Sequence, residues 1–325
     1  MAHVILITTG GTIASLPAPG GGVVAAGLGG SSLVAGPLAA PVVHDDFCVV
    51  GSYQMDLALA WRLALRVNQH LAAPDCLGAV VAHGTDTMEE SVFMADLLLA
   101  GDKPVVFTGA QHHAGEVGGD GPRNLADAIT LAASPAARGL GALLLFDQDV
   151  HAARDVAKAH TSRLDTFTSG DHGKLATVDG DTVFVYRQPR RRLRLEAGPP
   201  VDIPLLRMAM GMNGDLIRFL AAGPAPALVI EAFGRGNLPP DAGAAVREAI
   251  DAGKTVVITS RCPGGRVVPT YGNAGGGTDL ASAGALFAGD LAGNKVRILL
   301  SLLFALPLSA AARREHLAAL ADPAA

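Results

Sequence analysis

The sequence predicts an α/β protein of two domains, in which short apolar strands alternate with amphipathic helices. Apolar runs of strand length recur at residues 4–7, 79–82, 104–108 and 227–230, and helix-length segments lie between them. Strands that alternate with helices form parallel sheets joined by crossover helices. The chain of 325 residues also fits two domains, since a domain takes about 150 residues.

A break in composition indicates where the two domains meet. Residues 190–192 are three consecutive arginines, and residues 198–200 read Gly-Pro-Pro. A charged, proline-rich stretch of this kind is typical of a solvated linker. We therefore predict an N-terminal α/β domain with the larger sheet at residues 1–188, a linker at 189–204, and a smaller parallel-sheet domain at 205–325.

The composition argues against several classes of partner. The formal net charge is −5 and no basic stripe is present, so we expect no nucleic acid. The longest apolar run, residues 296–308, contains Arg297 and Pro307 and is too short to span a bilayer, so we expect no membrane.

The cysteine pattern predicts a cytoplasmic protein. Cys48, Cys76 and Cys262 are widely spaced and form no CxxC pair, which favours reduced, buried thiols over a disulfide framework or a zinc site. The first predicted strand begins at residue 3, which leaves no room for a signal peptide.

The first strand ends in a double-glycine turn that presents a hydroxyl. Gly10 and Gly11 lack Cβ atoms, so the backbone can take strained angles and approach a ligand closely. Thr12 follows at once, and ligands of open α/β sheets bind outside the carboxyl ends of the strands. Thr12 is therefore a candidate reactive group, with capping of a helix as the alternative role.

A second strand end repeats this pattern with a carboxylate added. The strand at residues 79–82 is followed by Gly84, the pair Thr85-Asp86 and an amphipathic helix. Asp86 can cap that helix and bind a cation at once, because its carboxylate has two oxygens. Glu89 and Glu90 suit the positive end of the helix dipole and need no catalytic role.

These two stretches, residues 9–13 and 83–90, resemble the TGGTI and HGTDTMEE signatures of the asparaginase/glutaminase family of amidohydrolases. Residues 154–158 resemble its RDVxK segment, and residues 234–238 its GxGNL turn. The resemblance implies hydrolysis of L-asparagine to L-aspartate and ammonia through a threonine nucleophile and an acyl-enzyme, with possible glutaminase side activity. It also implies a homo-oligomer, either a tetramer or a dimer, and we expect no metal and no cofactor.

The resemblance assigns roles to nine residues. The expected catalytic residues are Thr12, Thr85, Asp86 and Lys158, and the expected substrate-binding residues are Ser52, Tyr53, Gly11, Gly84 and Asn237. Lysine acts as a base only where its surroundings lower its pKa, and a lone lysine is ordinarily a solvated charge. The spacing alone leaves open which threonine attacks.

Three of the expected substrate-binding positions need comment. Ser52 would hold the α-carboxylate, but Ser52-Tyr53 also suits a simple turn before a helix at residues 55–71. Tyr53 stands where the family's common pattern has a polar amide. Asn237 would reach the substrate of a neighbouring subunit.

The segment at residues 15–36 departs from the family pattern. It is rich in Gly, Pro and Ala without periodicity, which predicts a mobile loop. The family's loop is a lid that brings a tyrosine to the first threonine, whereas here Val23 or Val24 falls near that place. The only tyrosines of the chain are Tyr53, Tyr186 and Tyr271.

Two other classes of function agree with parts of the sequence. A non-catalytic amino-acid sensor on the same scaffold agrees with the absent lid tyrosine, but a binder needs no lysine beside a Thr-Asp pair. A nucleotide-binding protein is disfavoured, because neither GxGxxG nor GxxxxGK[ST] follows the first strand. The adjacent residues His112 and His113 lie near Glu116 and Asp120, but adjacent loop residues rarely converge on one metal ion.

Overall fold

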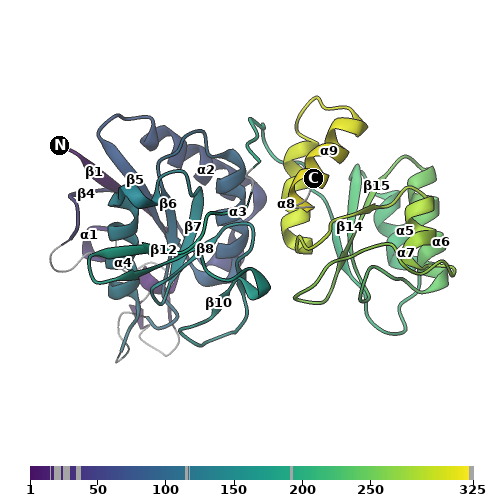
Figure 1. The fold of residues 1–325 in the computed structure, drawn as a ribbon, viewed down its shortest axis with the longest axis horizontal. Helices are drawn as coiled ribbons and strands as arrows, with labels where there is room; N and C mark the ends of the chain where they lie inside the picture. The colour runs from purple at the N-terminus through teal and green to yellow at the C-terminus, as the bar shows by residue number, and fades with distance from the viewer. Residues whose placement is uncertain are drawn as a thin grey trace. The chain divides into compact units, whose positions relative to one another are not determined.

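The computed structural model describes residues 1–321 except 15, 18–22, 25–29, 34–37, 114–115, 117 and 191–192. The chain divides into two compact units, Met1–Arg194 and Leu195–Ala325 (Figure 1).

The N-terminal unit is built on an eight-stranded sheet with the order β12-β11-β8-β7-β6-β5-β1-β4. Its strands are β1 (His3–Gly10), β4 (Val42–Val50), β5 (Cys76–Ala82), β6 (Val105–Thr108), β7 (Ala142–Phe146), β8 (Asp149–Ala152), β11 (Ala176–Asp179) and β12 (Thr182–Val185). The five adjacent strands β7, β6, β5, β1 and β4 are parallel to one another. Strands β8, β11 and β12 extend the sheet through antiparallel pairs. The sheet is therefore mixed.

Helices cover both faces of this sheet (Figure 1). The helices are α1 (Gly30–Leu33), α2 (Leu57–Leu71), α3 (Met88–Leu98) and α4 (Gly121–Ala133). Helix α4 packs on the face that carries Val4 and Leu6. Helix α2 contacts β5, and helix α3 contacts β6 and β7. The β1 and β5 strands are apolar along their length because both faces are buried.

Short elements complete the unit. They are the 3₁₀ turns η1 (Thr12–Ala14), η2 (Ser52–Gln54), η3 (Thr85–Thr87), η4 (Pro135–Ala137) and η5 (Gly170–His172), and the two-stranded sheets β2 (Leu16–Pro17) with β3 (Val23–Val24) and β9 (Ala157–Lys158) with β10 (Phe167–Thr168). Three of the turns, η1, η2 and η3, begin at residues predicted to belong to the site.

The C-terminal unit is a smaller parallel sheet between two helical layers (Figure 1). Its strands are β13 (Leu205–Arg207), β14 (Ala227–Ala232), β15 (Thr255–Ser260) and β16 (Leu286–Phe287), and its helices are α5 (Asp215–Ala222), α6 (Pro240–Asp251), α7 (Gly277–Ser282), α8 (Gly293–Leu303) and α9 (Ala310–Ala321). All three strand pairs are parallel. The predicted α/β class, with a larger N-terminal and a smaller C-terminal parallel sheet, is confirmed.

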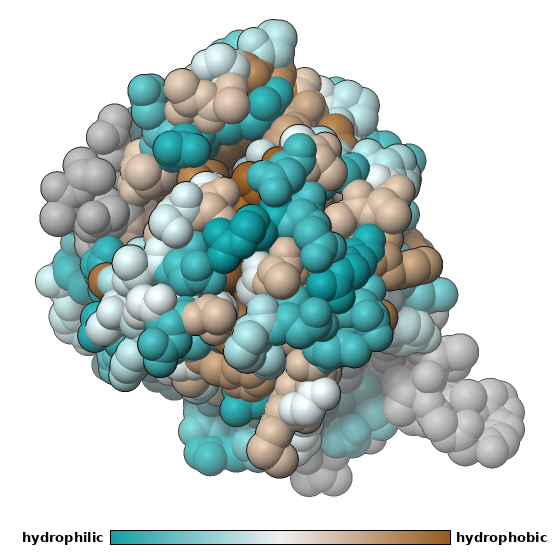
Figure 2. All heavy atoms as spheres, turned by 90° about the vertical axis from the view of Figure 1, so that its right-hand side faces the viewer, coloured by the Kyte–Doolittle hydropathy of each residue, from teal (hydrophilic) through white to brown (hydrophobic). Residues whose placement is uncertain are grey.

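The surface of the C-terminal unit is mainly hydrophilic on the face shown in Figure 2, where strongly hydrophobic residues are scattered. Exposed large apolar side chains of this unit include Met210, Leu216 and Phe219. Scattered apolar residues are ordinary on a protein surface. Over the described residues, no helix has the length and hydrophobicity to cross a bilayer.

The three cysteines are free, but the expectation that all are buried is wrong. Cys76 is buried on β5, Cys48 is partly buried on β4, and Cys262 is exposed. Cys262 lies in the bend just after β15 ends at Ser260, and only the strand itself is covered by helices.

Candidate active site

The site begins where the neighbouring parallel strands β1 and β5 end. Gly10 and Gly11 turn the first chain out of the sheet with φ angles of +94° and +82°. A Cβ atom on Gly11 would lie 2.5 Å from the N and Cα atoms of Gly84, so the two turns are in backbone contact. Because η1 and η3 follow directly, Thr12 and Thr85 start adjacent turns at the carboxyl edge of the sheet.

These turns line a pocket of about 340 Å³. Its lining residues are Gly11, Thr12, Gly51, Ser52, Tyr53, Gly84, Thr85, Asp86, Gln111, Lys158 and Thr161. Eight of the nine residues predicted from the sequence are therefore brought together. The volume is at the small end of ligand pockets, which span about 300–1,000 Å³, and the lining is mostly polar.

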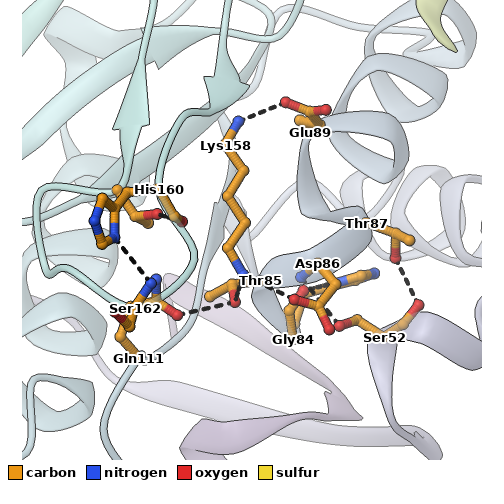
Figure 3. Close-up of polar contacts among 12 residues, drawn as sticks. Ser52, Gly84, Thr85, Asp86, Thr87, Glu89, Gln111, Lys158, His160 and Ser162 are labelled. Carbon is orange, nitrogen blue, oxygen red and sulfur yellow. Dashed lines mark hydrogen bonds and ion pairs between the residues drawn. The ribbon is translucent and has the colours of Figure 1, made fainter.

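Lys158 connects the threonine and the aspartate of the second turn (Figure 3). Its Nζ donates hydrogen bonds to Thr85 Oγ1 and to Asp86 Oδ1, both at 2.8 Å. The Lys158 and Asp86 side chains are 15% and 55% exposed, so the amine is sheltered and the carboxylate faces the opening. Thr85 is buried.

The segment that carries Lys158 is anchored by Glu89. The backbone N–H of Lys158 donates to Glu89 Oε2 at 2.6 Å (Figure 3). From the sequence Glu89 was expected only to suit the dipole of α3, and no local signal indicates this longer-range contact. Glu89 thus joins β9 to the start of α3, which also follows Thr85 and Asp86.

Ser52 supports the same turn from the η2 side. Its Oγ accepts from the Asp86 backbone N–H at 3.1 Å, and its carbonyl oxygen accepts from Thr87 Oγ1 at 2.8 Å (Figure 3). A Cβ atom on Gly84 would lie 2.7 Å from Ser52 Oγ, so glycine is required there. Among the described residues the Ser52 hydroxyl proton has no acceptor, so it can be donated to a ligand.

Tyr53 forms an outer wall of the pocket. Its side chain is 78% exposed and its ring lies over Gly51, where an added Cβ atom would approach within 2.5 Å. The tyrosine is therefore at the pocket but largely in solvent. Tyr186 is also exposed and is absent from the lining residues.

Gln111 is a pocket residue whose role the sequence analysis missed. It follows β6, the next parallel strand after β5, and its Oε1 accepts from Thr85 Oγ1 at 3.2 Å. Its position at a third neighbouring strand end is the signal in the sequence that points to it. Thr161, another lining residue, was missed because it follows a strand of only two residues.

The histidine of the second turn is buried and neutral. His83 is inaccessible to solvent, and burial lowers its pKa to about 4. Its Nδ1 donates to the Gly84 carbonyl oxygen at 2.7 Å, because that oxygen can only accept. Nε2 is buried without a hydrogen-bond partner among the described residues. His83 therefore supports the turn from within the core.

Asn237 is the predicted residue that the pocket does not contain. It lies in the C-terminal unit, where its Oδ1 accepts from the Gly277 backbone N–H at 3.1 Å. Most of the expected lid, residues 15–36, lies outside the described residues. Val23 and Val24 form β3, which pairs with β2.

The residues His112, His113 and Glu116 form a local cluster next to Gln111. His113 Nε2 lies 3.1 Å and His112 Nδ1 3.9 Å from the Glu116 carboxylate. In the described part of the chain, no group of three or more His, Cys, Asp or Glu side chains is arranged to hold a metal ion.

Two hydroxyls, a sheltered amine and a carboxylate surround a small polar pocket, and groups of these types can serve as a nucleophile, a proton acceptor and a ligand for a cation. The fold and the pocket are therefore those of an α/β protein with a polar, enzyme-like site at the carboxyl ends of its parallel strands.

Comparison with known proteins identifies the family. Residues 3–191 match the model of the N-terminal asparaginase domain, and residues 202–317 match that of the glutaminase/asparaginase C-terminal domain. The chain belongs to the asparaginase family and is an amidohydrolase.

Curated relatives match over nearly the whole chain. The chain is 33% identical to the L-asparaginase of Bacillus licheniformis, over 93% of this chain and 95% of that protein. It is 37% identical to the Probable L-asparaginase of Deinococcus radiodurans, over 95% of each. It is 31% identical to L-asparaginase 2 of Bacillus subtilis, over 81% of this chain and 70% of that protein.

Proposed function

We propose that this protein hydrolyses L-asparagine to L-aspartate and ammonia through a threonine nucleophile. The observation that carries the proposal is the position of Lys158 Nζ, 2.8 Å from both Thr85 Oγ1 and Asp86 Oδ1, in the pocket that Thr12 also lines. Family membership and the L-asparaginase relatives support the choice of substrate.

The attack is assigned to Thr12. Its Oγ1 makes no hydrogen bond with the part of the chain that the structure describes, whereas Thr85 Oγ1 is already engaged by Lys158 and Gln111. Thr12 Oγ1 adds to the side-chain amide carbon of the substrate and forms an ester. Its proton passes through Thr85 toward Lys158, and the amide nitrogen leaves with a proton as ammonia. Water then cleaves the ester and releases aspartate.

The remaining groups hold the substrate. Asp86 accepts from the α-ammonium group, since its carboxylate is half exposed at the opening. Ser52 donates its free proton to the α-carboxylate, and Tyr53 borders the same end. Gly11 and Gly84 line the pocket and carry no side chains of their own, so their backbone can contact the substrate directly.

The wider organisation is proposed on the same basis. Residues 1–188 form the catalytic domain, residues 189–204 the linker and residues 205–325 a second domain. Asn237 of that domain reaches the pocket of a neighbouring subunit in a tetramer or dimer. A cytoplasmic location agrees with three cysteines that are free.

The test is ammonia release from L-asparagine and L-glutamine by the purified protein. Thr12→Ala and Lys158→Met should each lower kcat by at least about a hundredfold. Thr182→Ala, an exposed threonine on β12, serves as the matched control and should keep full activity. Full turnover by Thr12→Ala would refute the nucleophile. Binding of aspartate without any ammonia release would favour the amino-acid sensor, and activity on glutamine would establish the side reaction.

A further inference from the structure

The Gln111 side chain bridges Thr85 and the loop that follows Lys158. Its Oε1 accepts from Thr85 Oγ1 at 3.2 Å, and its Nε2 donates to the Arg163 carbonyl oxygen at 3.2 Å. The second contact fixes the orientation of the amide. A carbonyl oxygen can only accept, so the NH₂ group must face Arg163 and the amide oxygen must face Thr85.

This orientation decides where Thr85 keeps its single proton. The amide oxygen of Gln111 also can only accept, so the Thr85 hydroxyl donates toward it. Only lone pairs of Thr85 Oγ1 then remain for Lys158, whose Nζ donates at 2.8 Å (Figure 3). In this arrangement Thr85 is an acceptor for the lysine and cannot give it a proton.

We propose that Gln111 is a positioning residue that sets the direction of the proton between Thr85 and Lys158. The proposal rests on the function proposed above. When Lys158 takes up a proton, the Thr85 O–H bond must turn from Gln111 to the lysine nitrogen. Gln111 therefore holds the pair in the state before transfer. The Asp86 carboxylate 2.8 Å from Lys158 Nζ and the Glu89 carboxylate at the Lys158 backbone N–H are the same in wild type and variants, so a change in the Gln111 acceptor should shift the pH at which the pair becomes active.

The side chain of Gln111 is not what holds the two segments in place. The backbone N–H groups of Gln111 and His112 donate to the Asp120 carboxylate at 3.0 and 2.9 Å. The Arg163 loop has its own contacts, since the Arg163 backbone N–H donates to His160 Nδ1 at 3.1 Å. Replacing the side chain thus removes two hydrogen bonds and leaves both backbones supported.

The experiment measures kcat and kcat/KM for ammonia release from L-asparagine over about pH 5–9. Gln111→Met keeps the length and loses both hydrogen bonds, so Thr85 is free to donate to Lys158. Its acid limb should move to lower pH by roughly half a unit, with kcat reduced about tenfold. Gln111→Glu keeps a stronger acceptor and adds a negative charge, so its acid limb should move to higher pH.

Opposite shifts of the two variants distinguish positioning of a proton from mere support of the fold. Gln69→Met, which changes an exposed glutamine on α2, should leave the profile unchanged. An acid limb that stays in place, or that moves in one direction for both variants, overturns the role of Gln111 and leaves the amidohydrolase intact. Absence of ammonia release by the wild-type protein would instead overturn the proposed function.

Discussion

Acidification should destabilise the N-terminal unit through the buried histidine beneath the pocket. His83 has a pKa of about 4 in the folded protein against an ordinary value of 6.5, because burial disfavours the imidazolium. As the pH falls below 6.5 the unfolded chain binds a proton at this residue and the folded chain does not. Stability is therefore lost between pH 6.5 and about 4, and above about pH 7.5 this residue has no effect.

The size of the effect follows from the two pKa values. Linkage gives a loss of about 2 kcal/mol between pH 8 and pH 5, rising to about 3 kcal/mol at pH 4 and below. Other groups titrate over the same range, so the variant His83→Asn isolates the contribution. Asparagine can keep a donor to the Gly84 carbonyl oxygen in place of Nδ1, but it does not titrate.

The assay is urea unfolding followed by the fluorescence of Trp61, the single tryptophan, which lies on α2 of the same unit. The free energy of unfolding should fall by about 2 kcal/mol more for the wild-type protein than for His83→Asn between pH 8 and pH 5. Equal losses in the two proteins would refute the assignment of His83 as a buried neutral histidine.

Three further changes test the packing and the charges. Gly11→Ala should abolish activity, because its Cβ atom would lie 2.5 Å from backbone, whereas Gly139→Ala, with a similar φ of +80° and open space, should keep activity. Phe107→Ala, at a fully buried site, should cost about 3–5 kcal/mol in urea unfolding. Asp45→Asn should lower the melting temperature at pH 7, since the hydrogen bond from Arg66 lowers the pKa of Asp45. That difference should shrink as the pH falls below 3.8, because the unfolded chain then binds a proton at Asp45 that the folded chain takes up only at a lower pH.

The central strands and the places of Thr12, Thr85 and Asp86 beside one pocket could be predicted because burial and strand ends leave clear marks in the sequence, whereas Lys158 was found only through the family resemblance. Strands β1, β5 and β6 are continuous apolar runs, and Thr12 and Thr85 follow two of them directly. The turn between β11 and β12 also leaves a mark, because Asp-Gly is typical of a hairpin and Gly180 has the positive φ of +58° that such a turn requires.

Other features carry no local signal. Strand β4 includes His44, Asp45 and Asp46 at the edge of the sheet, so its hydrophobic pattern is weak. The reversal from β7 to β8 is made by Asp147 and Gln148 at φ angles of +46° and +69°, a conformation usually encoded by glycine or asparagine. The sheet thus turns antiparallel where the sequence suggests no hairpin.

Lys158 and the Thr85 hydroxyl that it contacts are held by two different sheets. Thr85 follows a strand in the middle of the eight-stranded sheet, but β9 pairs with β10 in a sheet of two strands and two residue pairs. A two-stranded ribbon is only marginally stable by itself. Local opening of residues 157–168 therefore needs less free energy than unfolding of the unit, and amide exchange should be faster there than in β5. Local opening would move Lys158 away from Thr85. If Lys158 takes part in turnover, activity should then be lost at urea concentrations where the Trp61 fluorescence is still native, so that inactivation precedes unfolding.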